Sequence, residues 1–326
     1  MHRLSIVIPC PVFNQSAEDT LVSVLQNRPA DCEVIVVTAG KYDDPYELDG
    51  EVNFVEESKN ASLTQLANRG FDSASAEVVH LLQPGMQAVE DWTEPVLGHF
   101  DDPQVGAVSP AIVANATSTR AQSLGVAYRS CGIRRVIGKG AKLTDPRIAH
   151  SSVLGPSFDA GFYRRVLLTA LGGFDERMGA TYADVELALV LRQLGYHTIV
   201  EPASILVRGN VDLRTSSFQK ARQAERLYRR YSTHGPGSVV LHTLVAAADL
   251  LCKFPRPQML THACGRLAAW FESGIQEQCQ ERVHRAQAHL ARATVSQAPT
   301  SIRGDFSKGR GKQPAAVKAP LRRRAA

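Results

Sequence analysis

The feature that most constrains the fold is an alternation, through the first half of the chain, of short Val- and Ile-rich runs with amphipathic segments. The runs have the length of buried strands, and the longer segments between them place apolar residues on one face. Such an alternation predicts a mainly parallel sheet built from right-handed crossovers. The predicted strands are Ser5–Ile8, Glu33–Val37, Val52–Val55, Val78–Leu82, Val105–Ser109, Thr198–Val200 and Ile205–Val207.

Helical segments separate several of these strands. A Ser16/Asp19 capping pattern opens the predicted helix Ala17–Gln26, and Ser62 is the expected N-cap of Leu63–Ala74. From about residue 116 to 159 the periodicity weakens and basic and glycine residues dominate, so we expect a long binding or lid loop there. Periodicity returns at Val166–Leu171, and the remaining predicted helices are Trp92–Phe100, Asp184–Leu194, Phe218–Tyr231, Ser238–Cys252 and Gln258–Ala293.

Composition divides the chain into three parts. The 326 residues are 44% hydrophobic and 21% charged, which is ordinary for a globular protein, and the net charge of +5 is concentrated near the C-terminus. We expect an α/β domain over residues 1–232, a helical appendage over 233–293 and a disordered basic tail over 294–326.

The sequence lacks the patterns of a zinc site, a disulfide framework, a signal peptide and a membrane span. The six cysteines form no CxxC pair, which argues against a zinc site or a disulfide framework and fits reduced thiols in the cytoplasm. The N-terminal apolar run stops at Pro9, so it reads as a buried strand rather than a signal peptide. The longest apolar stretch, Val239–Cys252, is interrupted by His242 and Asp249 and falls short of a membrane span.

The densest pattern lies between residues 172 and 196. Gly172–Glu176 forms an acidic turn, and the helix after it begins with Asp184 and Glu186 and ends at Gly195. An Asp at a helix start can serve the helix dipole alone. The pattern closely resembles, however, the acceptor-side signature of family 2 glycosyltransferases, in which an Asp at the head of such a helix deprotonates a sugar hydroxyl.

The resemblance runs from Leu4 to about Tyr231. Leu4–Pro9 resembles the first strand of that family's GT-A fold, Asn68-Arg69-Gly70 resembles its Asn-x-Gly helix, and Val79–Gly85 resembles its metal-binding strand end. The pattern is most similar to the rhamnosyltransferase-like branch. It implies a GT-A fold and transfer of a sugar, with inversion, from a nucleotide-sugar donor to a glycan or lipid-linked acceptor.

The resemblance also implies roles for single residues. Asp184 is the expected catalytic base. Asp175, Glu176 and Glu186 are expected on the acceptor side, with a turn that buries Phe174 as the structural alternative for the first two and a structural carboxylate as the alternative for Glu186. The residues expected to contact the donor are Pro9, Thr38, Lys59, Arg69, Gln83, Gly85 and Arg208.

The chain departs from the family where a divalent ion is normally held. Thr38 and Ala39 replace acidic residues that bind the nucleotide base, Gly85 replaces the metal-binding Asp, and Arg208 ends a strand that lacks the usual His. The ligands that Mg²⁺ or Mn²⁺ would need are therefore degenerate, and we assign no residue to a metal and no certain cofactor.

Two interpretations of these departures stay open. In the first, a cationic side chain takes the place of the ion on the leaving diphosphate, with Arg208 favoured by its position. In the second, catalysis is lost and the chain is a glycosyltransferase-like binding or scaffold protein. The candidate cations are Lys59, Arg69, Lys139, Lys142 and Arg208.

Partners beyond donor and acceptor follow from charge. The basic tail favours an anionic membrane surface, which adds peripheral association with the inner membrane face to a cytoplasmic location. Val239–Cys252 is read as a helix packed on the domain, with an amphipathic membrane-surface helix as the alternative. No nucleic acid is expected, because the tail lacks interleaved aromatics and no nucleic-acid-binding module precedes it.

Overall fold

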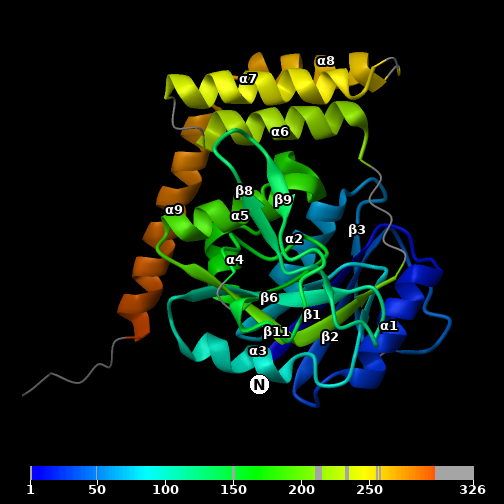
Figure 1. Cartoon of the computed structure of the whole chain (residues 1–326). Coiled ribbons are helices and arrows are strands. Elements are labelled where there is room, and N and C mark those ends of the chain that lie inside the picture. Colours follow the sequence, from blue (N-terminus) through cyan, green and yellow to red (C-terminus); the bar gives the residue numbers. More distant parts are fainter. Residues whose placement is uncertain are drawn as a thin grey trace, which may run out of the picture.

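The structure, a computed structural model, describes residues 2–48, 50–148, 151–209, 215–231, 235–254, 256 and 258–297. A central sheet is covered by helices on both faces, and three further helices stack at one end (Figure 1). The strands are β1 (Leu4–Cys10), β2 (Cys32–Ala39), β3 (Asn53–Glu57), β4 (Val78–Leu82), β5 (Met86–Ala88), β6 (Val105–Val113), β7 (Ala121–Ser123), β8 (Val126–Tyr128), β9 (Arg134–Val136), β10 (Ala160–Arg164) and β11 (His197–Arg208). The α-helices are α1 (Gln15–Asn27), α2 (Leu63–Ser73), α3 (Glu94–Leu97), α4 (Arg165–Leu171), α5 (Gly179–Gln193), α6 (Ser217–Tyr231), α7 (Pro236–Leu251), α8 (Gln258–Trp270) and α9 (Ile275–Gln297).

The sheet is mainly parallel, which confirms the prediction from the sequence. Its order is β3-β2-β1-β4-β10-β6-β11-β5. β1 is parallel to β2 and β4, and β11 is parallel to β6. β10 is antiparallel to both neighbours, and β5 is antiparallel to β11. The parallel strands therefore bring their carboxyl ends to one edge, where ligands of open α/β sheets bind.

Alternate residues of β1 contribute to two separate cores. Ile6 and Ile8 pack with residues of α1 and α3 on one face of the sheet, while Val7 packs with residues of α2, α4 and α5 on the other. All three side chains are at most 1% exposed. Because both faces are covered, the central strands read as continuous apolar runs rather than as an apolar–polar alternation.

The predicted helix starts are confirmed at α2 and wrong at α1. Ser62 caps α2, and its hydroxyl and the Gln65 side chain form a reciprocal capping box. At α1 the cap is Asn14 rather than Ser16, because Asn14 is extended and its side chain accepts from the amide of Ala17. The carbonyl of Ser16 instead accepts from the amide of Gly85.

Five strands, β5, β7, β8, β9 and β10, have no counterpart in the predicted set. β10 lies between β4 and β6 with four of its five residues buried, so it shows no polar–apolar alternation. β5 is only three residues long. The expected loop over residues 116–159 contains β7 and a two-stranded hairpin formed by β8 and β9, a structure that basic and glycine residues obscure in the sequence.

The C-terminal helices differ from the prediction at one break. The single helix expected over Gln258–Ala293 is split into α8 and α9 at Gly274, whose φ of +72° suits a residue without Cβ. α9 packs along α4, and Ala286 joins the main core. The division into 1–232 and 233–293 remains a prediction, and of the expected tail only residues 294–297, inside α9, are described. In the described part of the chain, no helix has the length and apolarity needed to span a bilayer.

Candidate functional site

The carboxyl ends of β4 and β11 meet through a close backbone contact. The carbonyl of Gly85, just after β4, accepts from the amide of Gly209, just after β11, at 2.7 Å. Gly85 has a φ of +92°, and its own amide donates to Thr20 Oγ1 at 2.8 Å. A glycine at the position where the resemblance expects an Asp therefore serves a left-handed turn that holds the two strand ends together.

Gln83 and Arg208 are brought together at this edge by Asp159. The carbonyl of Asp159 accepts from the amide of Gln83 at 2.9 Å, and its carboxylate forms an ion pair with the guanidinium of Arg208. The Gln83 side chain is 3% exposed, and its Oε1 has no hydrogen-bond partner among the described residues. A buried amide oxygen without a partner is costly, which makes Gln83 Oε1 a candidate acceptor for a donor group of a ligand.

Asp184 lies in α5 next to this group, and its carboxylate is fully buried. Its oxygens accept from Arg134 Nη2 at 2.5 Å, Arg134 Nε at 3.2 Å, and the amides of Phe158 and Val185 at 3.1 and 2.7 Å. Burial alone would lower the pKa of Arg134, but the charge and hydrogen bonds of Asp184 outweigh it and raise the pKa. Arg134, on β9, therefore stays charged in its ion pair with the expected base.

The other expected donor residues are spread along the same edge or away from it. Pro9 is buried in β1, and the hydroxyl of Thr38 donates to the carbonyl of Gly40 at 2.9 Å. Lys59 packs its alkyl chain against Gly40, leaving no room there for a Cβ. Arg69 is exposed on α2 and is not part of the group formed by Gln83, Asp159, Asp184 and their two arginines.

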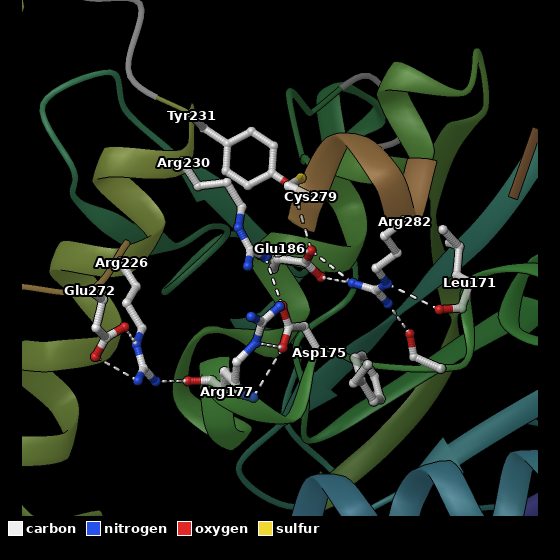
Figure 2. Close-up of polar contacts among 12 residues, drawn as sticks. Leu171, Asp175, Arg177, Glu186, Arg226, Arg230, Tyr231, Glu272, Cys279 and Arg282 are labelled. Atoms are coloured by element: carbon white, nitrogen blue, oxygen red, sulfur yellow. Dashed lines mark hydrogen bonds and ion pairs between the residues drawn. The ribbon is translucent and has the colours of Figure 1, made fainter. Parts of the chain in front are cut away.

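Two of the three expected acceptor-side acids, Asp175 and Glu186, lie in a second cluster, shown in Figure 2. Glu186 is 0% exposed, and its carboxylate accepts from Arg230 at 3.0 Å and from Arg282 at 2.8 Å. Asp175 pairs with Arg230 at 2.8 Å and with Arg177 at 3.0 Å. These contacts join α5 to α6 and α9 and favour the structural alternative for both acids.

Burial and ion pairing act in opposite directions on Asp175. Burial alone would raise the pKa of this carboxyl, but hydrogen bonds and charges from Arg177 and Arg230 lower it below its ordinary value. The turn before it is anchored independently, because Asn68 Nδ2 donates to the carbonyl of Phe174 at 3.0 Å and Asn68 Oδ1 accepts from its amide at 2.7 Å. The Asn-x-Gly pattern thus has a structural purpose in this chain. Glu176 begins a short 3₁₀ turn and is exposed.

The residues at the strand edge fit a divalent ion poorly. They supply one amide oxygen from Gln83 and the carboxylates of Asp159 and Asp184, each already paired with an arginine. Mg²⁺ prefers several oxygen ligands with free lone pairs. Within the described residues, no group of three or more His, Cys, Asp or Glu side chains is arranged to hold a metal.

Two site residues, Asp159 and Arg134, were missed from the sequence. Asp159 ends the irregular segment just before β10, and a lone acid before an unrecognised strand gives no signal. Arg134 belongs to a visible basic run, but its partner is fifty residues away on α5. Nothing short of the hairpin's fold would single it out from the neighbouring Arg135, which is exposed.

This architecture is the GT-A fold of nucleotide-sugar glycosyltransferases. One similar solved structure is GalNAc-T7 with UDP, GalNAc and Mn²⁺, with a TM-score of 0.61 and 13% identity over 92% of this chain and 58% of that chain. Another is S. aureus TarS 1–349, with a TM-score of 0.51 and 14% identity over 89% of this chain and 88% of that one. This chain thus spans little more than half of the GalNAc-T7 chain, and identities this low show the fold alone. No protein-family model and no curated protein sequence matches the chain significantly.

Proposed function

We propose that this protein is an inverting glycosyltransferase of the family 2 kind that moves a sugar from a nucleotide-sugar donor to a glycan or lipid-linked acceptor. The observation that carries the proposal is the group at the strand edge, in which a buried helix-borne carboxylate lies beside two arginines and an amide oxygen without a partner. The two structural neighbours support the fold, and this group supports the chemistry.

The reaction requires one proton acceptor and one site for the departing charge. Asp184 takes the proton of the acceptor hydroxyl, whose oxygen forms a bond to the anomeric carbon as the bond from that carbon to the diphosphate breaks. The nucleoside diphosphate leaves with the electron pair. For this step Arg134 must release the carboxylate, because every oxygen of Asp184 is otherwise occupied by a donor.

Arginine supplies the positive charge that a divalent ion supplies elsewhere. Arg208 lies at the end of β11 with its side chain 31% exposed, and its partner Asp159 also accepts from the backbone amide of Gln83. A guanidinium is a permanent cation and binds phosphate oxygens in a forked geometry. We expect Arg208 to hold the leaving diphosphate and Arg134 to turn from Asp184 toward the donor when it binds.

A second candidate function is favoured by the state of Asp184 itself. Its side chain is 0% exposed and fully hydrogen-bonded, as in a structural carboxylate. If Arg134 stays in place when ligands bind, the chain is a non-catalytic glycosyltransferase-like protein that binds a glycan, a nucleotide or a partner enzyme. The two candidates differ in whether a nucleotide sugar is turned over.

A thermal-shift panel with UDP, dTDP and GDP sugars, each with and without Mn²⁺, tests the proposal. We expect one nucleotide class to raise the Tm without metal, followed by release of the nucleoside diphosphate when an acceptor mixture is added. Stabilisation that appears only with Mn²⁺ would contradict the arginine mechanism. Binding without turnover would favour the second candidate. If no nucleotide sugar changed the Tm, the assignment of a nucleotide-sugar donor would be wrong.

A further inference from the structure

The helices α7 and α8 present large apolar side chains to solvent. They form the outermost layer at one end of the molecule, beyond α6 (Figure 1). On α7 the exposed fraction is 62% for Leu244 and 72% for Leu251. On α8 it is 59% for Leu267 and 62% for Trp270, and Phe271 just beyond is 88% exposed. We call these five residues the apolar face. Clustered exposure on this scale marks an interaction surface rather than ordinary scattered exposure.

The charged side chains of these two helices are all used in pairs. His242 lies against Glu225 of α6 at 3.1 Å, and Arg266 pairs with the same glutamate at 2.8 Å. Asp249 pairs with Lys253, with Arg266 and, at 2.6 Å, with His262. His242 and Arg266 therefore point toward the buried Glu225. Burial alone would raise the pKa of the Glu225 carboxyl, but these two partners lower it below its ordinary value. The apolar face is left without charge.

We infer that the apolar face lies on a lipid bilayer whose headgroups are anionic. The cations at one end of the two helices supply the complementary charge: Arg256 is exposed in the α7–α8 turn, and Lys220 is exposed in the first turn of α6. The start of α6 lies beside that turn, because the hydroxyl of Ser217 donates to the carbonyl of Gln258. Basic residues next to an apolar helical face are typical of helices that lie in the membrane interface.

Aromatic residues at the ends of the layer favour lipid over a second protein. Phe254, 68% exposed, lies at the α7–α8 turn, and Trp270 and Phe271 lie at the opposite end of α8. Aromatic rings concentrate at the boundary between acyl chains and headgroups. A protein interface has a polar rim around its apolar core, whereas the charged side chains of α7 and α8 are paired within this molecule.

The tip of the β8–β9 hairpin contacts α7, one of the two helices that carry the apolar face. Ser238 Oγ donates to the carbonyl of Ser130 at 3.1 Å, and His242 Nδ1 lies 2.9 Å from the carbonyl of Cys131. The tip of the hairpin is therefore fastened to α7. A bilayer against the apolar face lies on the hairpin side of the molecule, and this holds whether or not the protein is an enzyme.

Flotation of the full chain with vesicles tests the inference. Vesicles of phosphatidylcholine alone report the apolar contact, and vesicles that also contain phosphatidylglycerol add the electrostatic one. We expect the wild type to float with both and more strongly with the second. The double change Leu244→Glu and Leu267→Glu should lower the partition constant about a hundredfold, roughly tenfold for each leucine. Arg256→Gln should lower it several-fold on anionic vesicles only.

The matched control is Val22→Glu, an equally drastic change at a residue that is 51% exposed on α1. It should leave the partition constant unchanged, and thermal unfolding should show all variants folded. Binding to anionic vesicles that survives the double leucine change would assign the contact to the basic C-terminal tail and overturn the inference. So would absence of vesicle binding, or a dimer in light scattering that the double change dissociates without any effect on vesicles.

Discussion

Two carboxylates of α5, two residues apart in the sequence, have opposite surroundings. Asp184 pairs with one arginine, Arg134, whose side chain is 21% exposed. Glu186 pairs with Arg230 and Arg282, whose side chains are 2% and 13% exposed. Residues two positions apart in an α-helix are separated by roughly 200° around its axis, so the two carboxylates point to different sides. One faces the strand edge, and the other faces α6 and α9.

The difference shows what separates a carboxylate that is able to accept a proton from a substrate from one that only holds helices together. Arg134 lies on β9, none of whose residues belongs to a hydrophobic core, although Val126 of the paired strand β8 does, so the Arg134 side chain can move without displacing a core residue. Arg230 and Arg282 belong to helices whose residues form the main core, and Arg282 also donates to the carbonyls of Leu171 and Gly173. Ion pairing alone is therefore no sign of function. What distinguishes the two carboxylates is whether the arginine paired with each lies on an element of the main core.

The largest expected effect belongs to Asp184→Asn. Asn has the same size and still accepts from the amide of Phe158, but it cannot take a proton. Turnover with the nucleotide sugar that stabilises the protein most should fall about a thousandfold. Unchanged turnover in a folded variant would end the proposal that this residue is the base, and nucleotide binding measured in parallel should persist.

Glu186→Gln should affect stability rather than chemistry. The change leaves the buried guanidinium of Arg230 with only one carboxylate and that of Arg282 with none, so the free energy of unfolding should fall by about 3–5 kcal/mol. Chemical denaturation measures it. Glu281→Gln is the control, because Glu281 is 68% exposed and lies 3.8 Å from Arg285. A stable variant that loses turnover would return Glu186 to the acceptor side.

Most of the fold was predictable because its signals are local. Strands such as β1 and β4 are runs of Val, Ile and Leu, and the Ser62 cap and Gln65 lie within one helical turn. β10 was not predicted because a short strand that is buried on both faces shows no alternation of apolar and polar residues. The break between α8 and α9 was not predicted because a glycine inside a helical pattern does not by itself mark a helix end.

The site was predictable only in part because its pairs are remote in sequence. Arg208 ends β11 and Gln83 follows β4, whereas Asp184 lies in the second turn of α5, which begins at Gly179 and not at Asp184 as predicted; the types of all three residues suggested chemistry. Which arginine meets which acid depends on the hairpin and on β10, which bring Arg134 to Asp184 and Asp159 to Arg208. For the same reason Asp175 and Glu186 resembled acceptor residues until α6 and α9 supplied their partners.

Arg208→Gln should lower kcat about a hundredfold by removing the charge from the leaving diphosphate. Arg69→Gln is the matched control, because Arg69 was expected at the donor but is exposed on α2. Its kinetics should equal those of the wild type. Arg208→Lys should recover part of the loss, and Mn²⁺ should recover none. Equal losses at both arginines would contradict the assignment of the donor side to the end of β11.

The smallest effect is expected in the acid stability of the Asp175 pair. Because its pKa is lowered on folding from the ordinary value of 3.8, Asp175 stabilises the protein fully above about pH 5 and progressively less as the pH falls. Below about pH 4 the free energy of unfolding of the wild type should therefore fall more steeply than that of Asp175→Asn, by up to roughly 1.4 kcal/mol per pH unit. Urea denaturation across this range measures both curves. Asp43→Asn, at an exposed pair with Lys41, should run parallel to the wild type. If the Asp175→Asn curve is also parallel, the ion pairs of Asp175 contribute nothing to folding, and the contrast between the two clusters would rest on Glu186 alone.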